Sequence, residues 1–556
     1  MASGPKKSQL EQCNRANPGR YIRLMIHRRA SLALVLWFNL PVVHSQDGDP
    51  WYSFGSNGIA QHYISMESDV VTESLAQPDG RILVACRLGK VYQNNGSVVV
   101  ARFDAWGAFD PGFGDQGISV VNFCTGGDYL EDIALQPDGK IVGVGYEYEY
   151  FYTDPIYNQL VTFRLTDTGA LDNSYGTGGL TFVSVGPDGP SRATGIAVLP
   201  DGNILGCGYY WPSADRDLMF FRYTAAGILD TTFGNFGIKL HPNAPISEPT
   251  DIVVQPDGKF LISGLCASNQ FAVMRFHPDG TVDTDFGNSG VSLTSLLDGS
   301  VAKRIALLSN GTVLIGGTAT QTNPTSKELA LVRLLPDGSL DNTFGSGGVV
   351  LNGYSSYIYD AFHDMALLPD GRIVVAAALP TVPTDPDMSV ACFAPSGGLV
   401  VSFGGDGLAG HNISDSHLAK SICVLPDGKV IAIGNGPSQW WASSDEDVAL
   451  AGYVPLPGYQ VASIPESLKD ATRISVWPNP VQAGNAFIVA APPDFQIDHI
   501  EVRGSDGRLL LQQTVPNGAA TFQLIGTTTV QFAPGMYCLV ATDRSGVRLS
   551  SMLVVN

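Results

Sequence analysis

The sequence predicts an all-β protein: a seven-bladed β-propeller with four-stranded blades, whose N-terminal strand closes the last blade, followed by a small C-terminal β-sandwich. The length of 556 residues exceeds what one hydrophobic core supports. With 63 Gly, 35 Pro and only 15% charged residues, the composition excludes a long helical protein, and 44% hydrophobic residues exclude wholesale disorder. A hairpin motif that recurs seven times decides the architecture.

Residues 1–45 are expected to be an N-terminal extension and a cleaved signal peptide. Four arginines precede an apolar run at 30–43, and small Ser45 lies just before Gln46, which is the layout of a secretory signal. The run is too short to span a bilayer, so we expect export without a transmembrane segment. Met25 is an alternative start. The arginines are Arg20, Arg23, Arg28 and Arg29.

The hairpin motif consists of an apolar strand, a Pro-Asp-Gly turn and a second apolar strand, as in IALQPDGKIVGVG (133–145). Proline presets φ in the turn, aspartate bonds the backbone nearby, and glycine accepts positive φ. Two strands joined in this way form a hairpin. The turn residues are Asp79, Asp138, Asp201, Asp257, Asn310, Asp370 and Asp427.

A second motif, Asp-x-x-Phe-Gly-x-x-Gly, runs in step with the hairpins and follows all but the last of them, as in LVRLLPDGSLDNTFGSGGVV (331–350). Each repeat therefore offers four short strands, the pattern of a propeller blade. The first copy, FGSNG (54–58), precedes every hairpin, whereas the last repeat stops after VALAGYVP (448–455). We expect the early copy to complete the late blade, so that the propeller spans 46–455 and no blade keeps a free edge.

These two motifs resemble the delta-60 repeat of β-propeller proteins over about 51–455. Departures are local: Asn310 replaces the turn aspartate, Tyr175 replaces the phenylalanine, and SFGGDG (402–407) lacks the leading aspartate. The resemblance implies the fold and leaves the activity open.

After a linker at 456–471, residues 472–556 carry no repeat. WPNP (477–480), SDGRLL (505–510), PGMYCLV (534–540) and the terminal MLVVN resemble the type A C-terminal sorting domain of the type IX secretion system. The resemblance implies that residues 472–556 engage the type IX secretion machinery, in a cell envelope of the Bacteroidota kind. The protein would then be secreted or attached to the outer-membrane surface. An adhesive β-sandwich is the alternative.

Charge and motifs exclude several functions. Beyond residue 45 the chain has 25 basic and 51 acidic residues, so nucleic acid is not an expected partner. No catalytic signature is found, and we expect no enzyme. DTDFG (283–287) has alternating carboxylates but lacks the other ligands of a calcium loop. We expect no metal site and no cofactor, with calcium as the one alternative.

The residue six positions before each turn residue is expected at the mouth of the central channel. Four of the seven are acids and one is arginine, which suits a cation or the hydroxyls of a polar ligand. Plain solvation of strand starts is the alternative. The seven are Glu73, Asp132, Gly195, Asp251, Arg304, Asp364 and Ser421, of which Asp132, Asp251 and Asp364 are candidate ligand-binding residues.

Aromatic residues gather in the loops of the same face and are expected to be exposed, as at recognition surfaces. Packing of the loops on one another is the alternative. The candidates are Tyr148, Tyr150, Tyr152, Tyr209, Tyr210, Trp211, Tyr357, Tyr359, Trp440 and Trp441.

The leading hypothesis is a secreted, non-catalytic propeller that binds a glycan or protein on this aromatic and acidic face. The alternatives are a carbohydrate-active enzyme using Asp251 and Asp364, and a surface structural protein without a discrete ligand.

Overall fold

The computed structural model describes two parts of the chain. The first consists of residues 47–64, 69–88, 97–123, 127–148, 159–186, 189–212, 215–322, 325–352, 362–377, 388–404, 407–411, 418–435 and 448–454. The second consists of residues 475–477, 487–490, 497–504, 509–519, 521–524, 535–543 and 548–555. The predicted signal peptide and the predicted linker lie outside these residues.

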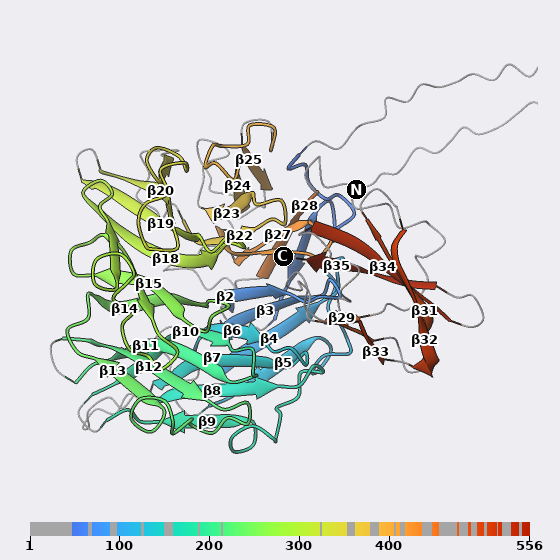
Figure 1. The fold of residues 1–556 in the computed structure, drawn as a ribbon, viewed down its shortest axis with the longest axis horizontal. Helices are drawn as coiled ribbons and strands as arrows, with labels where there is room; N and C mark the ends of the chain where they lie inside the picture. The colour runs from blue at the N-terminus through green and yellow to red at the C-terminus, as the bar shows by residue number, and fades with distance from the viewer. Residues whose placement is uncertain are drawn as a thin grey trace, which may run out of the picture. The chain divides into compact units, whose positions relative to one another are not determined.

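All regular elements of these ranges are β-strands, and the first part forms four-stranded antiparallel sheets (Figure 1). The first sheet contains β2 (Asp69–Ala76), β3 (Ile82–Leu88), β4 (Ser97–Phe103) and β5 (Ile118–Val121). The second contains β6 (Gly127–Leu135), β7 (Ile141–Tyr148), β8 (Leu160–Leu165) and β9 (Leu180–Val183). The third contains β10 (Ser191–Val198), β11 (Ile204–Tyr210), β12 (Asp217–Tyr223) and β13 (Ile238–His241).

The next four sheets repeat this plan. The fourth contains β14 (Ile246–Val254), β15 (Phe260–Cys266), β16 (Phe271–Phe276) and β17 (Val291–Thr294). The fifth contains β18 (Gly299–Leu307), β19 (Val313–Thr322), β20 (Thr325–Leu334) and β21 (Val349–Asn352). The sixth contains β22 (Asp364–Leu367), β23 (Ile373–Ala377), β24 (Met388–Phe393) and β25 (Leu408–His411). The seventh joins β26 (Leu418–Val424), β27 (Val430–Asn435) and β28 (Val448–Tyr453) to β1 (Ile59–His62).

The first strands of successive sheets contact one another in chain order. β2 contacts β6, and contacts follow through β10, β14, β18 and β22 to β26, which contacts β2 again. β1 pairs antiparallel with β28, with Ala60 opposite Leu450. An all-β protein built from such four-stranded sheets is consistent with a β-propeller, as the sequence predicts.

The Pro-Asp-Gly turns have the predicted chemistry. In the first sheet Gly80 has a φ of +87°, which glycine accepts without strain. The Gly80 amide donates to the Gln77 carbonyl at 2.9 Å, and the Arg81 amide donates to Asp79 Oδ1 at 3.1 Å. The turn therefore fixes the register of β2 against β3.

The second motif ties each sheet to the next. In the fifth sheet Arg333 Nε donates to Asp341 Oδ2 at 2.8 Å, and the guanidinium lies 4.6 Å from the Phe344 ring centroid. Arg333 Nη1 also donates to the Pro395 carbonyl of the sixth sheet, and the Gly345 amide donates to the Ser396 carbonyl at 2.7 Å. The aspartate, the aromatic ring and the glycine of the motif thus all serve packing. The same arginine recurs at Arg102, Arg164, Arg222 and Arg275.

The N-terminal segment takes part in the same contacts. In the sixth sheet Cys392 and Val400 stand at the arginine and aspartate positions. There Arg372 Nη1 and Ser402 Oγ donate to Asp47 Oδ2, at 3.3 and 3.2 Å. The Gly404 amide donates to the Asp47 carbonyl at 2.7 Å, as Gly345 does to Ser396. Residue 47 therefore occupies the place of a turn residue of the next repeat.

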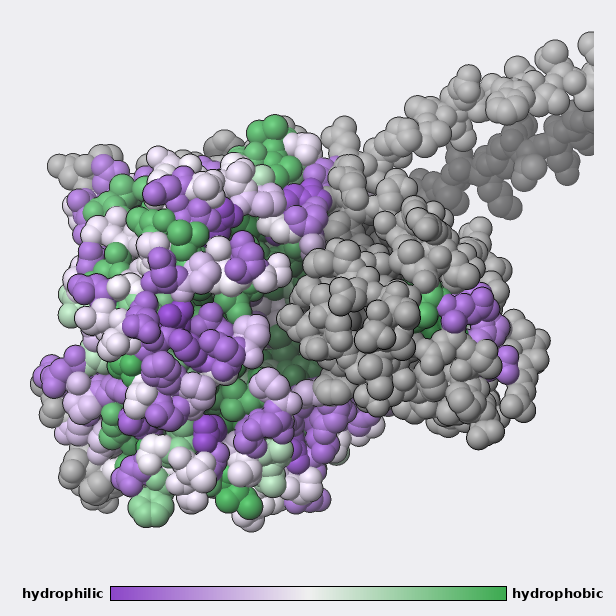
Figure 2. All heavy atoms as spheres, in the orientation of Figure 1, coloured by the Kyte–Doolittle hydropathy of each residue, from purple (hydrophilic) through white to green (hydrophobic). Residues whose placement is uncertain are grey.

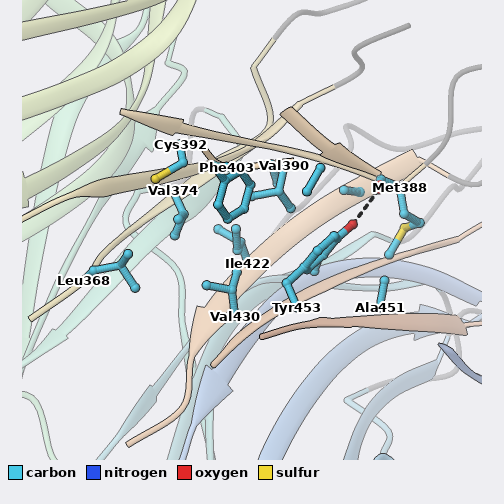
Figure 3. Packing of buried hydrophobic residues seen from close by; sticks show 14 of the residues in the cluster. Leu368, Val374, Met388, Val390, Cys392, Phe403, Ile422, Val430, Ala451 and Tyr453 are labelled. Carbon is cyan, nitrogen blue, oxygen red and sulfur yellow. Dashed lines mark hydrogen bonds between the residues drawn. The ribbon is translucent and has the colours of Figure 1, made fainter. Parts of the chain in front are cut away.

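Hydrophobic residues fill the space between neighbouring sheets. Between the sixth and seventh sheets, Phe403, Ile422, Val430 and Tyr453 are buried together, and Tyr453 Oη donates to the Met388 carbonyl at 2.7 Å (Figure 3). On the surface in Figure 2, hydrophilic and hydrophobic residues of the described part are interspersed. The cores are thus repeated units between sheets.

The C-terminal residues form two further sheets. One contains β29 (Ser475–Trp477), β30 (Phe487–Ala490) and β33 (Thr521–Leu524). The other has the order β32 (Leu509–Ala519), β31 (Ile497–Gly504), β34 (Gly535–Asp543) and β35 (Arg548–Val555). In the part of the chain that the structure describes, no helix is long and apolar enough to cross a membrane.

Candidate functional site

Residues six positions before the turns converge on one cavity. It has a volume of about 530 Å³, and Glu73, Asp132, Asp251, Arg304 and Asp364 line it. We call these five residues the ionic cluster. Four of them directly follow a shift of register in the first strand of their sheet, and Asp364 begins β22. The shift, a β-bulge, redirects the side chain.

Each aspartate of the cluster also bonds the next sheet. Asp132 Oδ2 accepts the Ile196 amide of β10 at 2.9 Å. Asp251 Oδ2 accepts the Ile305 amide at 2.9 Å, and Asp364 Oδ2 accepts the Ile422 amide at 2.9 Å. The three aspartates therefore hold neighbouring first strands together in addition to lining the cavity.

Arg304 is the cation of the cluster. Its guanidinium pairs with Glu73 and, through Nε, with Asp364 Oδ1 at 2.8 Å. The Ser421 hydroxyl donates to Asp364 Oδ2 at 2.9 Å. Four carboxyl groups thus surround one guanidinium.

This crowding shifts the protonation equilibria. Burial raises the pKa of Glu73 to about 7 against the opposing attraction of Arg304, and the Asp364 charge adds to the rise. Burial also raises the pKa of Asp132 well above its usual range, with a further contribution from Glu73. Burial raises the pKa of Asp251 as well. The cluster therefore binds protons in a pH range where exposed carboxylates do not.

Apolar side chains also contribute to the cavity wall. They include Leu75, Leu135, Leu367 and Val424, which follow the cluster positions along their strands. The cavity thus extends from the cluster toward the Pro-Asp-Gly turns. That these acids share a face with the aromatic loops stays a prediction, because most of those loops lie outside the described residues.

The predicted exposure of Tyr209 and Tyr210 is wrong. Each is only 6% exposed, because both rings lie within β11 and pack against the neighbouring sheets. The half-buried Trp211 has the Arg216 guanidinium 4.4 Å from its ring centroid. For these residues the loop-packing alternative describes the structure.

Arginines and aromatic rings alternate across the first three sheets. Arg87 lies 4.6 Å from the Tyr129 ring, which stacks on Tyr146 at 4.7 Å. Arg192 lies 4.6 Å from the Tyr146 ring, and Arg216 lies 5.0 Å from the Tyr209 ring. Such cation–π contacts hold the sheets together at this end. The sequence interpretation did not include Arg87, Arg192 or Arg216, although each lies beside an aromatic loop.

The remaining aromatic candidates are not placed. Tyr148 is in β7, but its side chain is outside what the structure describes. Tyr150, Tyr152, Tyr357, Tyr359, Trp440 and Trp441 lie outside the described residues. Their role in recognition stays a prediction.

In the ranges that the structure describes, no group of three or more His, Cys, Asp or Glu side chains is arranged to hold a metal ion. In the candidate calcium loop, Asp283 Oδ2 accepts Arg275 Nε at 2.7 Å and Lys259 Nζ at 2.8 Å. These cations occupy the oxygen that a metal would need.

The profile of a family described as a domain of unknown function (DUF5122) beta-propeller matches residues 77–113, 255–286 and 308–344. No curated protein matches the chain. A novel fungal alcohol oxidase of the AA5 family, in complex with copper, is 14% identical over 90% of this chain and 100% of that chain, with a TM-score of 0.40. PorZ, an essential bacterial surface component of the type-IX secretion system of Porphyromonas gingivalis, is 12% identical over 87% of this chain and 81% of that chain, with a TM-score of 0.23.

The profile match supports the β-propeller fold. At TM-scores below 0.5 the two structural likenesses carry no weight for the function of this chain.

Proposed function

We propose that this protein is an exported, closed seven-bladed β-propeller that binds a ligand in its central cavity without transforming it. The observation that carries the proposal is the cavity, which is lined by the charged side chains of the ionic cluster from five different sheets. Binding sites typically measure about 300–1,000 Å³ and combine apolar walls with a few convergent polar groups. Perturbed pKa values in such a cavity strengthen the case.

Two sets of contacts support closure. β26 of the seventh sheet contacts β2 of the first, and β1 supplies the outer strand of the seventh sheet. The Gly55 amide donates to the Trp106 carbonyl of the first sheet at 2.9 Å, the bond by which each repeat contacts the next.

No observation favours catalysis by Asp251 and Asp364. Both oxygens of Asp251 accept backbone amides, from Ile252 at 2.8 Å and Ile305 at 2.9 Å. Asp364 accepts Arg304 and the Met365 amide at 2.8 Å. Carboxylates held in this way are suited to positioning the strands.

Export is proposed from the two ends of the sequence. Residues 1–45 have the layout of a signal peptide, and residues 472–556 carry the motifs of a type IX sorting domain. We therefore propose the type IX secretion machinery as a partner through residues 472–556. A glycan or protein remains a candidate ligand through Trp440, Trp441 and the other unplaced aromatic residues.

Filling the cavity tests ligand binding. Ala306 lines the cavity, and Ala306→Phe should occlude it. We expect ligands found for the purified exported protein, on glycan arrays and in thermal-shift screens of small polar molecules, to lose at least tenfold in affinity. Ala108→Phe at an exposed turn is the matched control. Unchanged binding by Ala306→Phe would rule out the cavity, and loss of binding in Trp440→Ala/Trp441→Ala would move the site to the aromatic loops.

A further inference from the structure

One carboxyl group of the ionic cluster differs from the others. Asp251 and Asp364 each use both oxygens in hydrogen bonds, and Glu73 pairs with Arg304 and accepts the Ser74 amide at 3.0 Å. Asp132 is 8% exposed, and its one hydrogen bond within the described residues is from the Ile196 amide to Oδ2. Its Oδ1 atom is left without a hydrogen-bond donor at the cavity wall.

The cause lies in the neighbouring sheets. The equivalent position of the third sheet is Gly195, which has no side chain to reach Asp132. Arg304, across the cluster, is already paired with Glu73 and Asp364. Asp132 Oδ1 therefore faces the cavity, where a ligand donor can reach it, while burial of the side chain raises the pKa of Asp132.

The charge around Asp132 favours a cation. Glu73, Asp251 and Asp364 face it from β2, β14 and β22, and Arg304 from β18 is the only cation of the ionic cluster. The first strands of the third and seventh sheets contribute Gly195 and Ser421, which carry no charge. A positively charged ligand group next to Asp132 would relieve the remaining negative charge.

The apolar side chains of the cavity wall indicate which group the ligand carries next to its cation. Beyond the cluster, Leu75, Leu135, Leu367 and Val424 form an apolar wall toward the turns. An alkyl chain is buried favourably against these side chains, because its apolar surface leaves water. An inorganic cation would leave this wall unused, and the described carboxylates are not arranged as a metal site.

Building on the proposed function, we propose that the central cavity binds an alkylammonium group, with its N–H donating to Asp132 Oδ1 and its chain against the apolar wall. A free aliphatic amine and a lysine side chain both present this chemistry. Burial raises the pKa of Asp132 and raises the pKa of Glu73 to about 7, so arrival of the ammonium, which favours the charged carboxylates, releases protons. Affinity therefore rises with pH until the amine itself loses its charge.

Calorimetry with three probes tests this inference on the exported protein. The probes are n-pentylammonium, the peptide acetyl-Gly-Lys-Gly-amide and uncharged n-pentanol. We expect saturable binding of at least one cationic probe, none of pentanol, and a several-fold gain in affinity between pH 6 and pH 8. The two cationic probes distinguish a free amine from a lysine side chain.

Asp132→Asn should weaken the binding of the cationic probe at least tenfold. The side-chain amide oxygen of asparagine can still accept the hydrogen bond from the Ile196 amide, but the side chain no longer carries a negative charge. Asp257→Asn, at an exposed turn, is the control. A melting temperature near that of the parent shows that the variant is folded. Equal affinity for pentanol, or undiminished affinity in Asp132→Asn, would overturn the proposal. If neither cationic probe binds, but other ligands bind and Ala306→Phe abolishes their binding, then the proposed function of the cavity is supported and the alkylammonium proposal is wrong.

Discussion

Asp283 shows what the repeated aspartate of the second motif contributes. Although its burial favours the neutral acid, hydrogen bonds from Lys259, the Asp285 amide and Arg275 hold the pKa of Asp283 at about 2. The ordinary pKa of an aspartate side chain is 3.8. A carboxyl whose pKa is lower in the folded than in the unfolded state stabilises the fold above the unfolded pKa, and this contribution is lost as pH falls through the folded pKa.

We therefore expect Asp283→Asn to be less stable than the parent at pH 7. The shift of pKa corresponds to about 2 kcal/mol, and the lost pairing of Arg275 adds to it. The difference from the parent should shrink as pH falls from about 4 to 2, where the parent also loses its charged Asp283. Urea unfolding at pH 7, 4 and 2.5 measures both effects, with Asp257→Asn as the control. A constant difference at all three pH values would contradict the linkage.

Residue identity alone did not reveal which aromatic rings are exposed. Tyr209 and Tyr210 follow the hairpin of the third sheet and look like loop residues, yet β11 extends through Tyr210. The Arg216 guanidinium lies over the Tyr209 ring, and Tyr210 packs in the hydrophobic cluster between the second and third sheets; both contacts follow from the packing of adjacent strands and sheets. The acids, in contrast, could be predicted to converge, because their spacing from the turn is the same in every repeat.

At the scale of elements, the split repeat is the most informative feature. In the seventh sheet β28 ends at Tyr453, and the sequence continues with Val454 and Pro455. The N-terminal segment begins, within the described residues, at Asp47-Gly48, and Gly48 has a φ of +82°. If Val454-Pro455 is followed directly by Asp47-Gly48, the four residues match the turn sequence His277-Pro278-Asp279-Gly280 of the fourth sheet in its last three residues.

The hydrogen bonds follow the same correspondence. The Val454 amide donates to the Asp49 carbonyl at 2.9 Å, as the His277 amide does to the Thr281 carbonyl at 2.8 Å. The first and last described residues of the repeat region thus contribute to one turn of the repeat. The sequence predicts the shared sheet from the orphan strand, but the shared turn needs the geometry of Gly48.

A circular permutant tests this correspondence. Residues 47–64 are moved behind Pro455, and the chain starts at Asp69, so that Pro455 joins Asp47 directly. We expect the unfolding free energy to stay within about 1 kcal/mol of a parent that ends at the same linker. The shorter chain that lacks residues 47–64 loses buried Trp51 and Phe54, and each such loss costs about 3–5 kcal/mol. It should unfold or melt far lower.

Chemical denaturation and thermal melting of the three chains decide the outcome. A permutant as unstable as the shortened chain would show that the junction is not a turn of the repeat. A shortened chain with the parent's melting temperature would show that β1 is dispensable to the ring.

At the scale of the whole molecule, the two parts of the chain differ in charge. Residues 472–556 contain five Arg, five acidic residues and no Lys, so the large negative charge belongs to the repeats. Their strands pair only among themselves: β29 to β35 form two sheets, and β1 to β28 form the others. The C-terminal residues therefore contribute no strand to the sheets that surround the cavity.

This separation predicts that export and propeller stability can be uncoupled. A chain that ends at residue 471 keeps the predicted signal peptide and strands β1 to β28 of the described residues. In a host with a type IX secretion system, we expect it to cross the inner membrane and stop in the periplasm, with the melting temperature of its propeller unchanged. The full chain should reach the surface or the medium. Fusion of residues 472–556 to an unrelated periplasmic carrier should move that carrier outward. Immunoblots of cell fractions measure each outcome, and a truncated chain that still appeared in the medium would refute the sorting role of residues 472–556.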